Sequence, residues 1–340
     1  MPFSHHSHSS SFCAHASSPL ESMIQTAISR DMFLYALTEH MPRDQEDFYP
    51  EEIPLHPTAA SLAAQITAFH ASATSLRTKY APQIALPIGF EAEWIRPSTL
   101  PAIQALLTAH KWDFFIGSVH HVHTIPIDFD RATYESARER ALLLYQSSPR
   151  YDEAATMQPD SDEILFEDYF DAQLAMLVAL RPPVVGHFDL IRLYSNARDA
   201  ALSRWPGVWS RVCRNLGFIA GYGGIVEINS SALRKGLAEP YPTAEVCREF
   251  LGLGGRFTLS DDAHDVTQVG THYAQALAFA KGVGVTALHR LDILAGSDYA
   301  SSQAPDAAAN STPQPTFTPI RMTSLENHPF FSAEPSPPTA

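Results

Sequence analysis

Runs of apolar, β-branched and aromatic residues alternate along the chain with segments in which apolar residues recur every three or four positions. The first kind of segment is typical of buried strands, and the second is typical of helices that bury one face. The alternation therefore predicts repeated βα units and an α/β fold. Strands are expected at residues 2–8, 33–40, 84–91, 114–120, 184–187, 225–229 and 256–262, with a weaker eighth candidate at residues 285–288.

Two helix starts are marked in the sequence. The segment Ser18-Pro19-Leu20-Glu21 has the residue types of a capping box with proline at the first helical position. Apolar residues then follow at the spacing of a single helical face. A second helix, with an apolar stripe of its own, is expected from about Thr58.

Seven or eight βα units over 340 residues favour a closed, TIM-like parallel barrel. Periodicity alone is also compatible with an open, doubly wound sheet. We expect the barrel to occupy residues 1–295, with excursions from it at residues 42–57 and 147–162. Residues 296–340 are rich in Ser, Pro and Ala, which predicts an irregular tail. The residues expected to pack this tail locally are Phe317, Ile320, Phe330 and Phe331.

Composition narrows the class of protein. With 45% hydrophobic and 18% charged residues, the chain is not expected to be disordered, and no apolar stretch reaches the roughly 20 residues of a membrane helix. The 23 Lys and Arg against 37 Asp and Glu give a net charge of -14, which argues against nucleic acid or anionic lipid as a partner. The N-terminus lacks the pattern of a secretory signal.

The cysteines indicate the compartment. Cys13, Cys213 and Cys247 are an odd number and lack metal-type spacing, so a disulfide framework is not expected and a reducing compartment fits, by default the cytoplasm. Cys13 is expected to be a small packed residue, although it lies close to a histidine-rich segment.

Residue types that ligate metals end six of the predicted strands. In a parallel barrel the C-terminal strand ends open on one face, so such residues converge there. His6 and His8 are separated by one residue, as are Asp262 and His264, so in extended chain each pair projects from the same side. The candidate metal ligands are His6, His8, His15, His40, Glu91, His120, His187, Asp262 and His264.

Each of these histidines alone has a simpler explanation. A single strand-end histidine is more often a hydrogen-bonded structural residue, and the run from His5 to His8 is compatible with a tag remnant or a polar start. Their coincidence at six strand ends favours metal binding, because burying so many imidazoles and carboxylates is costly without a cation. Imidazole and carboxylate together suit zinc, iron or manganese.

The number of candidates also predicts the chemistry. Four ligands saturate a zinc ion, so nine candidates indicate two or three ions, with Glu91 as a possible bridge. Such clusters polarise phosphoryl oxygens and lower the pKa of bound water, which predicts hydrolysis of a phosphate ester. An acidic protein needs local cations to bind phosphate. Arg192 and Arg234 follow the fifth and sixth strand ends, and we expect Arg192 to be the better candidate, while pairing with a neighbouring acid is the alternative for both.

The motifs together resemble the polymerase and histidinol phosphatase (PHP) superfamily, from Pro2 to about Asp292. The segments with this resemblance are His6-Ser7-His8 with His15, Thr38-Glu39-His40, Gly89-Phe90-Glu91, Gly117-Ser118-Val119-His120, Gly186-His187-Phe188-Asp189 and Asp262-Ala263-His264. Within the superfamily, Tyr49-Pro50-Glu51-Glu52, the segment from His187 to Arg192 and the segment from Glu227 to Gly236 resemble the fungal-type histidinol-phosphatases.

The resemblance implies a distorted (β/α)7 barrel with three divalent metal ions (Zn, Mn or Fe) at the C-terminal strand ends. It implies one ion held by His6, His8, Glu91 and Asp262, a second by Glu91, His120 and His187, and a third by His15, His40 and His264.

The implied activity is metal-dependent hydrolysis of L-histidinol phosphate to L-histidinol and phosphate in histidine biosynthesis. Arg192 would offset charge on the phosphoryl oxygens, and Asp262 and His264 are the candidates for protonating the leaving alkoxide. The acidic residues Glu46, Asp47, Glu51 and Glu52 could bind the cationic part of the substrate if their loop folds over the site, although a solvated loop is the simpler interpretation.

Two other functions stay open. One is another PHP-type phosphodiesterase or nuclease, against which the acidic charge argues because strand binding usually needs a basic track. The other is a noncatalytic metal-binding protein, against which the mixed His and carboxylate ligands without paired cysteines argue. The sequence does not indicate an oligomeric state.

Overall fold

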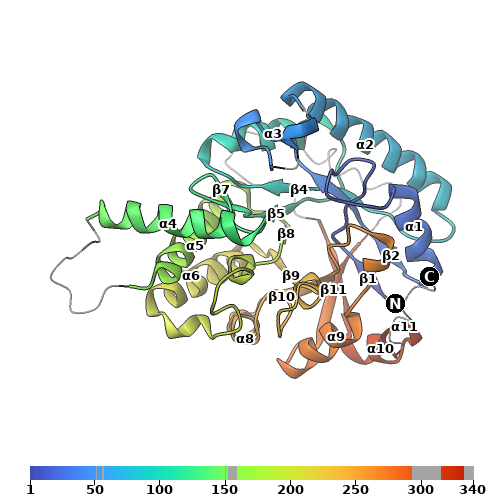
Figure 1. The fold of residues 1–340 in the computed structure, drawn as a ribbon. Helices are drawn as coiled ribbons and strands as arrows, with labels where there is room; N and C mark the ends of the chain where they lie inside the picture. The colour runs from blue at the N-terminus through green and yellow to red at the C-terminus, as the bar shows by residue number, and fades with distance from the viewer. Residues whose placement is uncertain (51, 56, 150, 152–158, 293–314, 333–340) are drawn as a thin grey trace, which may run out of the picture.

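The centre of the molecule is a set of mostly parallel strands (Figure 1). The computed structural model describes residues 1–340 except 51, 56, 150, 152–158, 293–314 and 333–340. Six parallel strands form one sheet in the order β10-β9-β8-β5-β4-β3, which confirms an α/β fold with a parallel sheet. These strands are β3 (Leu37–His40), β4 (Ile88–Glu93), β5 (Ile116–Ser118), β8 (Val184–Val185), β9 (Ile225–Asn229) and β10 (Arg256–Ser260).

The N-terminal segment contacts both edges of this sheet. Strand β1 (Phe3–Ser4) pairs in parallel with β2 (Leu34–Tyr35), which continues into β3 after one residue. On the opposite side, the His8 amide donates to the Ala263 carbonyl at 2.8 Å, just beyond β10. The Thr38 amide in β3 donates to the Ser7 carbonyl at 3.2 Å. These bonds hold the first histidine pair between the ends of β3 and β10.

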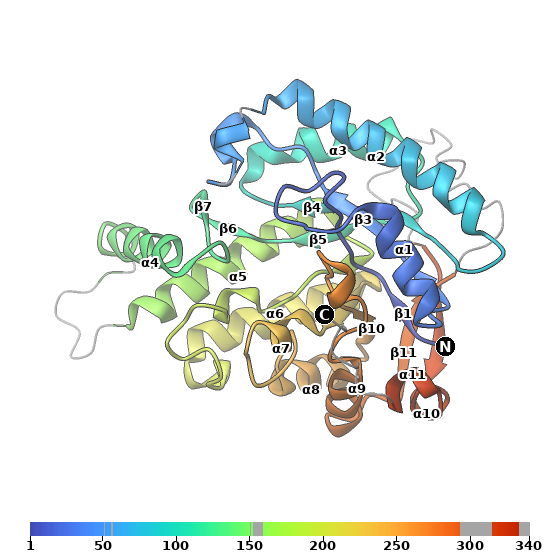
Figure 2. The same cartoon turned by 45° about the vertical axis from the view of Figure 1, so that its right-hand side comes forward.

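Helices lie around the outside of the strands (Figures 1 and 2). The long helices are α1 (Leu20–Ser29), α2 (Ala59–Tyr80), α3 (Leu100–Ala109), α4 (Arg131–Gln146), α5 (Ser161–Leu180), α6 (Pro206–Tyr222), α8 (Ala244–Gly252) and α9 (Tyr273–Gly282). The short helix α7 (Ser231–Arg234) follows β9 directly. The hairpin of β6 (His121–Val122) and β7 (Ile125–Pro126) follows β5 and leads towards α4.

The two predicted helix starts have different outcomes. The α2 helix begins after Thr58, whose side chain accepts from the Ser61 amide, so this start is confirmed. The capping box predicted at Ser18 is wrong, because Pro19 occupies the N-cap position of α1 and makes no side-chain cap. The Ser18 hydroxyl instead donates to the Asp265 carboxylate at 2.7 Å, which ties the start of α1 to the loop after β10.

The C-terminal part of the chain differs from the prediction. The eighth candidate strand is β11 (Ala287–Leu291), which pairs antiparallel with β12 (Phe317–Arg321) outside the parallel sheet. The helices α10 (Met322–Glu326) and α11 (Pro329–Ser332) follow. The prediction of an irregular tail is therefore wrong for residues 315–332, and the rest of residues 296–340 lies outside the described residues. Phe330 and Phe331 pack against Tyr273 at the start of α9, and not only within the tail as expected.

Alternation along the strands separates an apolar layer from a polar one. In β4, Phe90 lies on the side of Trp112 and Phe115, with ring centroids 5.0 and 5.8 Å away. The neighbouring residues Glu91 and Glu93 point to the opposite face, because successive side chains alternate. Both carboxylates are nevertheless buried, at 1% and 0% exposure. The inner face of the sheet is therefore polar towards the strand ends, and this layer forms the site.

In the described part of the chain, no helix combines the length and the apolar character needed to cross a membrane.

Candidate metal centre

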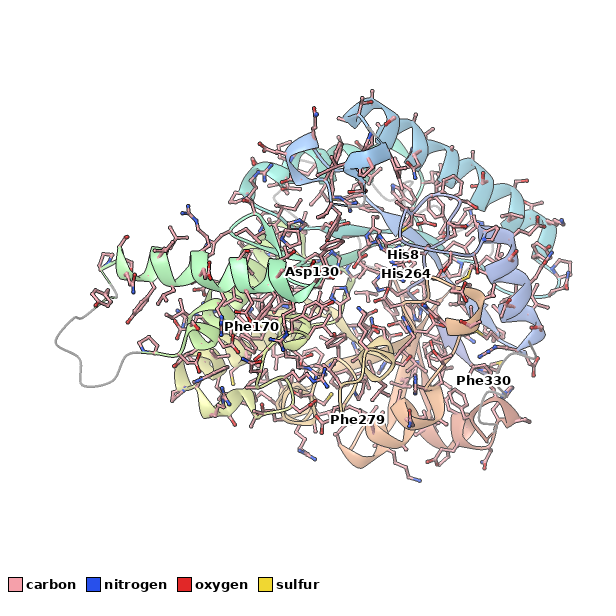
Figure 3. All side chains as sticks on the ribbon, viewed as in Figure 1. His8, Asp130, Phe170, His264, Phe279 and Phe330 are labelled. Carbon is pink, nitrogen blue, oxygen red and sulfur yellow. The ribbon has the colours of Figure 1, made fainter. Side chains whose placement is uncertain are left out.

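The candidate ligands meet at the C-terminal ends of the parallel strands. His8, from the N-terminal segment, and His264, from the loop after β10, stack with ring centroids 4.4 Å apart although 256 positions separate them (Figure 3). All nine side chains suggested by the sequence lie in this one region, and their contacts are described below in the three ligand sets that the resemblance implies. His40 stands close to two of these sets, because its Nδ1 atom lies 3.0 Å from Glu91 Oε2.

The first group contains four side chains. His6 Nε2 lies 3.4 Å from Glu91 Oε2 and 3.7 Å from Asp262 Oδ1. His8 Nε2 lies 3.5 Å from the same Glu91 oxygen and 3.6 Å from the same Asp262 oxygen. Four ligand atoms thus enclose one point, with each histidine facing both carboxylates.

The second group uses the other oxygen of Glu91. Its Oε1 atom lies 3.1 Å from His187 Nε2 and 3.4 Å from His120 Nε2. The two histidine nitrogens are 3.0 Å apart. Glu91 therefore presents one carboxylate oxygen to each group, which is the arrangement of a bridging ligand.

The third group lies nearest to the surface. His15 Nε2 and His40 Nε2 are 3.3 Å apart, and the His264 ring centroid lies 4.9 Å from that of His15. Cys13 is 7% exposed, as expected of a packed residue. The ligand atoms of Cys13, His8, His40 and His264 nevertheless all lie within 4.8 Å of one another, so a thiol belongs to the surroundings of this group.

The geometry fits metal ions. Ligands about 2.0–2.1 Å from a tetrahedral zinc ion are separated by roughly 3.4 Å, which matches the spacing in the first two groups. Several ring nitrogens of these groups are buried without a hydrogen-bond partner among the described residues, and a buried polar atom of this kind needs a ligand. Among them, His6 Nε2 and His8 Nε2 face the carboxylates of the first group and are therefore the nitrogens that a metal ion would satisfy.

The groups are electrostatically coupled. Burial alone would lower the pKa of His6, but the nearby Glu91 and Asp262 raise it well above its ordinary value. Burial would raise the pKa of Glu91, yet His6 and His120 hold it well below its usual range. Burial, followed by His40 and His264, lowers the pKa of His15 to about 2. Carboxylate anions therefore stand beside a protonated His6, and a metal ion bound in the first group would take the place of that proton, because a coordinating imidazole is neutral.

Further carboxylates, which we did not single out from the sequence, orient these ligands. Glu227 in β9 lies 3.3 Å from His6 Nδ1 and accepts from the His187 amide at 2.7 Å. Glu93 lies 2.8 Å from His40 Nδ1. Carboxylates behind histidines fix the ring orientation and tautomer of metal ligands. The sequence of β9 contains a signal for Glu227, because this acid stands between the apolar residues Val226 and Ile228 of a buried strand.

A cavity of about 630 Å³ opens onto the cluster. Seven of the nine candidate ligands line it, and Arg234 and Lys235 supply cations. The Arg234 guanidinium donates to the carbonyls of Asp261 and Asp262 at 3.1 and 3.0 Å, which holds it at the rim of the first metal group. Tyr49, Asp128 and Phe129 also line the cavity.

Arg192 does not line this cavity, contrary to the sequence-based preference for it over Arg234. Its side chain is 1% exposed, and its Nε lies 3.2 Å from the Asp189 carboxylate. Its Nη2 atom donates to the Glu239 and Pro240 carbonyls at 2.9 and 2.6 Å. The guanidinium is thus used within the fold, where it fastens the loop after α7.

The acidic loop does not offer free carboxylates either. Arg96 pairs with Glu46 and with Asp47, and its nitrogens lie 2.6 and 2.8 Å from the two Asp47 oxygens. Glu52 accepts from Arg43 at 2.5 Å. The fourth acid, Glu51, lies outside the described residues. The arginine partners make these three acids poor candidates for binding a substrate cation.

The fold and the site define a class: a parallel α/β protein with clustered histidines and carboxylates, suited to several divalent metal ions, at the strand ends. The chain belongs to the PHP domain family, whose model matches residues 4–231.

Curated relatives cover most of the chain. It is 38% identical over 291 residues to a probable histidinol-phosphatase of Schizosaccharomyces pombe, covering 85% of this chain and 89% of the relative. It is 35% identical over 302 residues to histidinol-phosphatase of Saccharomyces cerevisiae, covering 79% and 85% of the two chains.

A solved structure shares the fold. It is that of histidinol phosphate phosphatase (HisK) from Lactococcus lactis complexed with zinc, L-histidinol and phosphate. The TM-score is 0.58 at 18% identity, and the match covers 85% of this chain and 95% of that one.

Proposed function

We propose that this protein is a histidinol-phosphatase, a metal-dependent phosphomonoesterase that converts L-histidinol phosphate to L-histidinol and phosphate in L-histidine biosynthesis. The observation that carries the proposal is the cavity lined by seven of the nine candidate metal ligands together with the cations Arg234 and Lys235. Both fungal relatives have this name, and the Lactococcus lactis protein of the same fold was solved with zinc, L-histidinol and phosphate.

The proposal includes three divalent metal ions. Zinc is the favoured metal, ahead of manganese or iron. The first ion would be held by His6, His8, Glu91 and Asp262. The second would be held by Glu91, His120 and His187, and the third by His15, His40 and His264. Bound metal would polarise the phosphoryl oxygens and supply a hydroxide nucleophile near neutral pH. The ligand spacing, the buried nitrogens without partners and the zinc in the Lactococcus lactis structure support this assignment.

The protein's own cations would bind the phosphate. Arg234 is held by two backbone carbonyls at the rim of the cavity, so its remaining donors are available for phosphoryl oxygens. Lys235 adds a second positive charge beside it. This assignment replaces Arg192, whose guanidinium is buried among its own partners. Asp262 and His264 serve as metal ligands in this proposal, and neither is assigned the leaving-group proton.

The proposed architecture is a distorted (β/α)7 barrel that carries the site at its C-terminal strand ends. Hydrogen bonds from the N-terminal segment to the chain after β10 and to β3 support closure, because they join the two edges of the sheet. Three unpaired cysteines support a reducing compartment such as the cytoplasm.

The decisive experiment measures phosphate release and metal content on one sample, before and after chelation. The substrates are L-histidinol phosphate, p-nitrophenyl phosphate and a dinucleotide. We expect fast, chelator-sensitive release from L-histidinol phosphate with more than one equivalent of metal. A metal-loaded protein that acts on the dinucleotide instead would indicate a phosphodiesterase, and one inert on all three would indicate a noncatalytic metal-binding protein.

A further inference from the structure

One acidic side chain of the cavity, Asp128, has a buried oxygen without a hydrogen-bond partner among the described residues. Asp128 lies between the β6–β7 hairpin and helix α4, and its neighbour Asp130, which caps α4, is labelled in Figure 3. The Asp130 carboxylate is used by the fold, because it accepts from the Thr133 amide and hydroxyl at 2.7 Å. The Oδ1 atom of Asp128 is buried and has no hydrogen-bond partner among the described residues. Leaving such an oxygen unsatisfied is costly, which indicates that a ligand completes it.

Asp128 lines the same cavity as the candidate metal ligands and two aromatic rings. The rings of Tyr49 and Phe129 line the same cavity, with centroids 6.1 Å apart. Burial and then the charge of Asp128 raise the pKa of Tyr49 well above its usual value. The Asp128 charge therefore acts on the aromatic part of the cavity lining.

We propose that Asp128 binds the ammonium group of the substrate and so selects an amino alcohol phosphate over other phosphate esters. The inference rests on the proposed function, since L-histidinol phosphate has a primary amine on the carbon next to the phosphate-bearing carbon. With the phosphate at the metals and Arg234, that amine is close to the ester oxygen and within the same cavity. A carboxylate and an ammonium group form a strong, charge-assisted hydrogen bond. Tyr49 and Phe129 then provide apolar surface for the imidazole ring.

The acids of the loop at residues 42–57 do not compete for this role. Glu46 and Asp47 are paired with Arg96, and Glu52 is paired with Arg43. Asp128 is the acid of the described cavity lining that is neither a candidate metal ligand nor paired with an arginine.

The test compares two substrates that differ only in the amine: L-histidinol phosphate and 3-(imidazol-4-yl)propyl phosphate. For each enzyme we consider the ratio of the two kcat/KM values. In Asp128→Asn this ratio is expected to fall about 10- to 100-fold, the size of a lost hydrogen bond between charged groups, and mainly through KM for L-histidinol phosphate. Glu46→Gln removes one exposed, arginine-paired carboxylate from the same region and is expected to leave the ratio unchanged.

The outcomes separate this inference from the proposed function. A wild-type enzyme that prefers L-histidinol phosphate, together with an unchanged ratio in Asp128→Asn, would overturn the role of Asp128 alone. A wild-type enzyme that hydrolyses p-nitrophenyl phosphate but not L-histidinol phosphate would overturn the proposed function. Metal content and thermal unfolding of the variant reveal misfolding. Asp128→Glu then serves as a second variant, because it keeps the charge and should retain more of the preference than Asp128→Asn.

Discussion

Two sets of carboxylates lie near the cavity, and they differ in what faces them. The loop acids Glu46, Asp47 and Glu52 are paired with arginines, so their charge is balanced within the chain. The cluster acids Glu91 and Asp262 face histidines, several of whose nitrogens have no hydrogen-bond partner among the described residues. The comparison distinguishes carboxylates that hold the fold together from carboxylates that are placed to receive a cation.

Burial makes this difference stronger. Glu91 is 1% exposed, so its charge without a cation would be costly, whereas the Glu46 side chain is 72% exposed and is hydrated in any case. Substitutions in the cluster should therefore change metal binding and activity, and substitutions in the loop should change little.

Glu91→Gln is expected to have the largest effect. The two oxygens of Glu91 face two different histidine groups, and an amide would replace this bridging anion by a neutral group. We expect loss of metal together with a fall of at least about 10³-fold in kcat/KM, since the metals supply several kcal/mol of transition-state stabilisation. Metal analysis and phosphate release on the same sample test this. Glu139→Gln, an exposed position on α4, is the control, and full activity of Glu91→Gln would refute the bridging role.

Arg234→Met and Arg192→Met should separate binding from stability. Loss of Arg234 is expected to lower kcat/KM about 10- to 100-fold, because it removes charged hydrogen bonds to the phosphate. Loss of Arg192 is expected to cost about 3–5 kcal/mol of unfolding free energy, because the Asp189 carboxylate, at 0% exposure, would lose its partner. Denaturant unfolding and steady-state kinetics on both variants measure the two effects. A stable but inactive Arg192→Met enzyme would restore the preference for Arg192 that the sequence suggested.

The two arginines show where sequence reasoning reaches its limit. Both follow a strand end, and both lie in segments that resemble the fungal-type histidinol-phosphatases, so the sequence did not show which guanidinium reaches the cavity. The direction of each guanidinium depends on tertiary contacts: Asp189 and two carbonyls take Arg192 away from the cavity, while the carbonyls of Asp261 and Asp262 keep Arg234 at it. The histidines were easier to predict, because parallel strands bring their C-terminal ends together whatever the loops do.

Boundaries and long-range pairing explain the other differences. The predicted strand at residues 84–91 ended two residues before the observed end of β4, so Glu93 was placed outside the strand and its inward direction was missed. The strand β12 pairs with β11 across the segment 293–314, and local composition holds no information about such a distant partner. Ser18 likewise has the residue type of a helix cap, but its hydroxyl donates to the Asp265 carboxylate, a partner far away in the sequence.

Glu227→Gln is expected to weaken metal binding about 10- to 100-fold, less than the loss of a ligand. Glu227 is not one of the proposed ligands, but it contacts His6. It also accepts hydrogen bonds from the Ser260 hydroxyl at 2.7 Å and from the side-chain amide of Asn229 at 2.8 Å. An amide in its place would turn one acceptor into a donor and release the His6 ring. Competition with a chelator of known affinity measures the change. Unchanged metal affinity would show that His6 is oriented without this carboxylate.

Glu46→Gln is expected to have the smallest effect. Arg96 keeps its other partner, Asp47, whose side chain is 4% exposed and lies 2.6 Å away. The buried Arg96–Asp47 ion pair of the loop is therefore retained in this variant. Exposed ion pairs contribute little, and we expect a change within about 0.5 kcal/mol in unfolding free energy and no change in kcat/KM for L-histidinol phosphate. Thermal unfolding and steady-state kinetics check both. A rise in KM confined to L-histidinol phosphate would mean that the loop acids touch the substrate amine despite their arginine partners, and the distinction between the two sets of carboxylates would then fail.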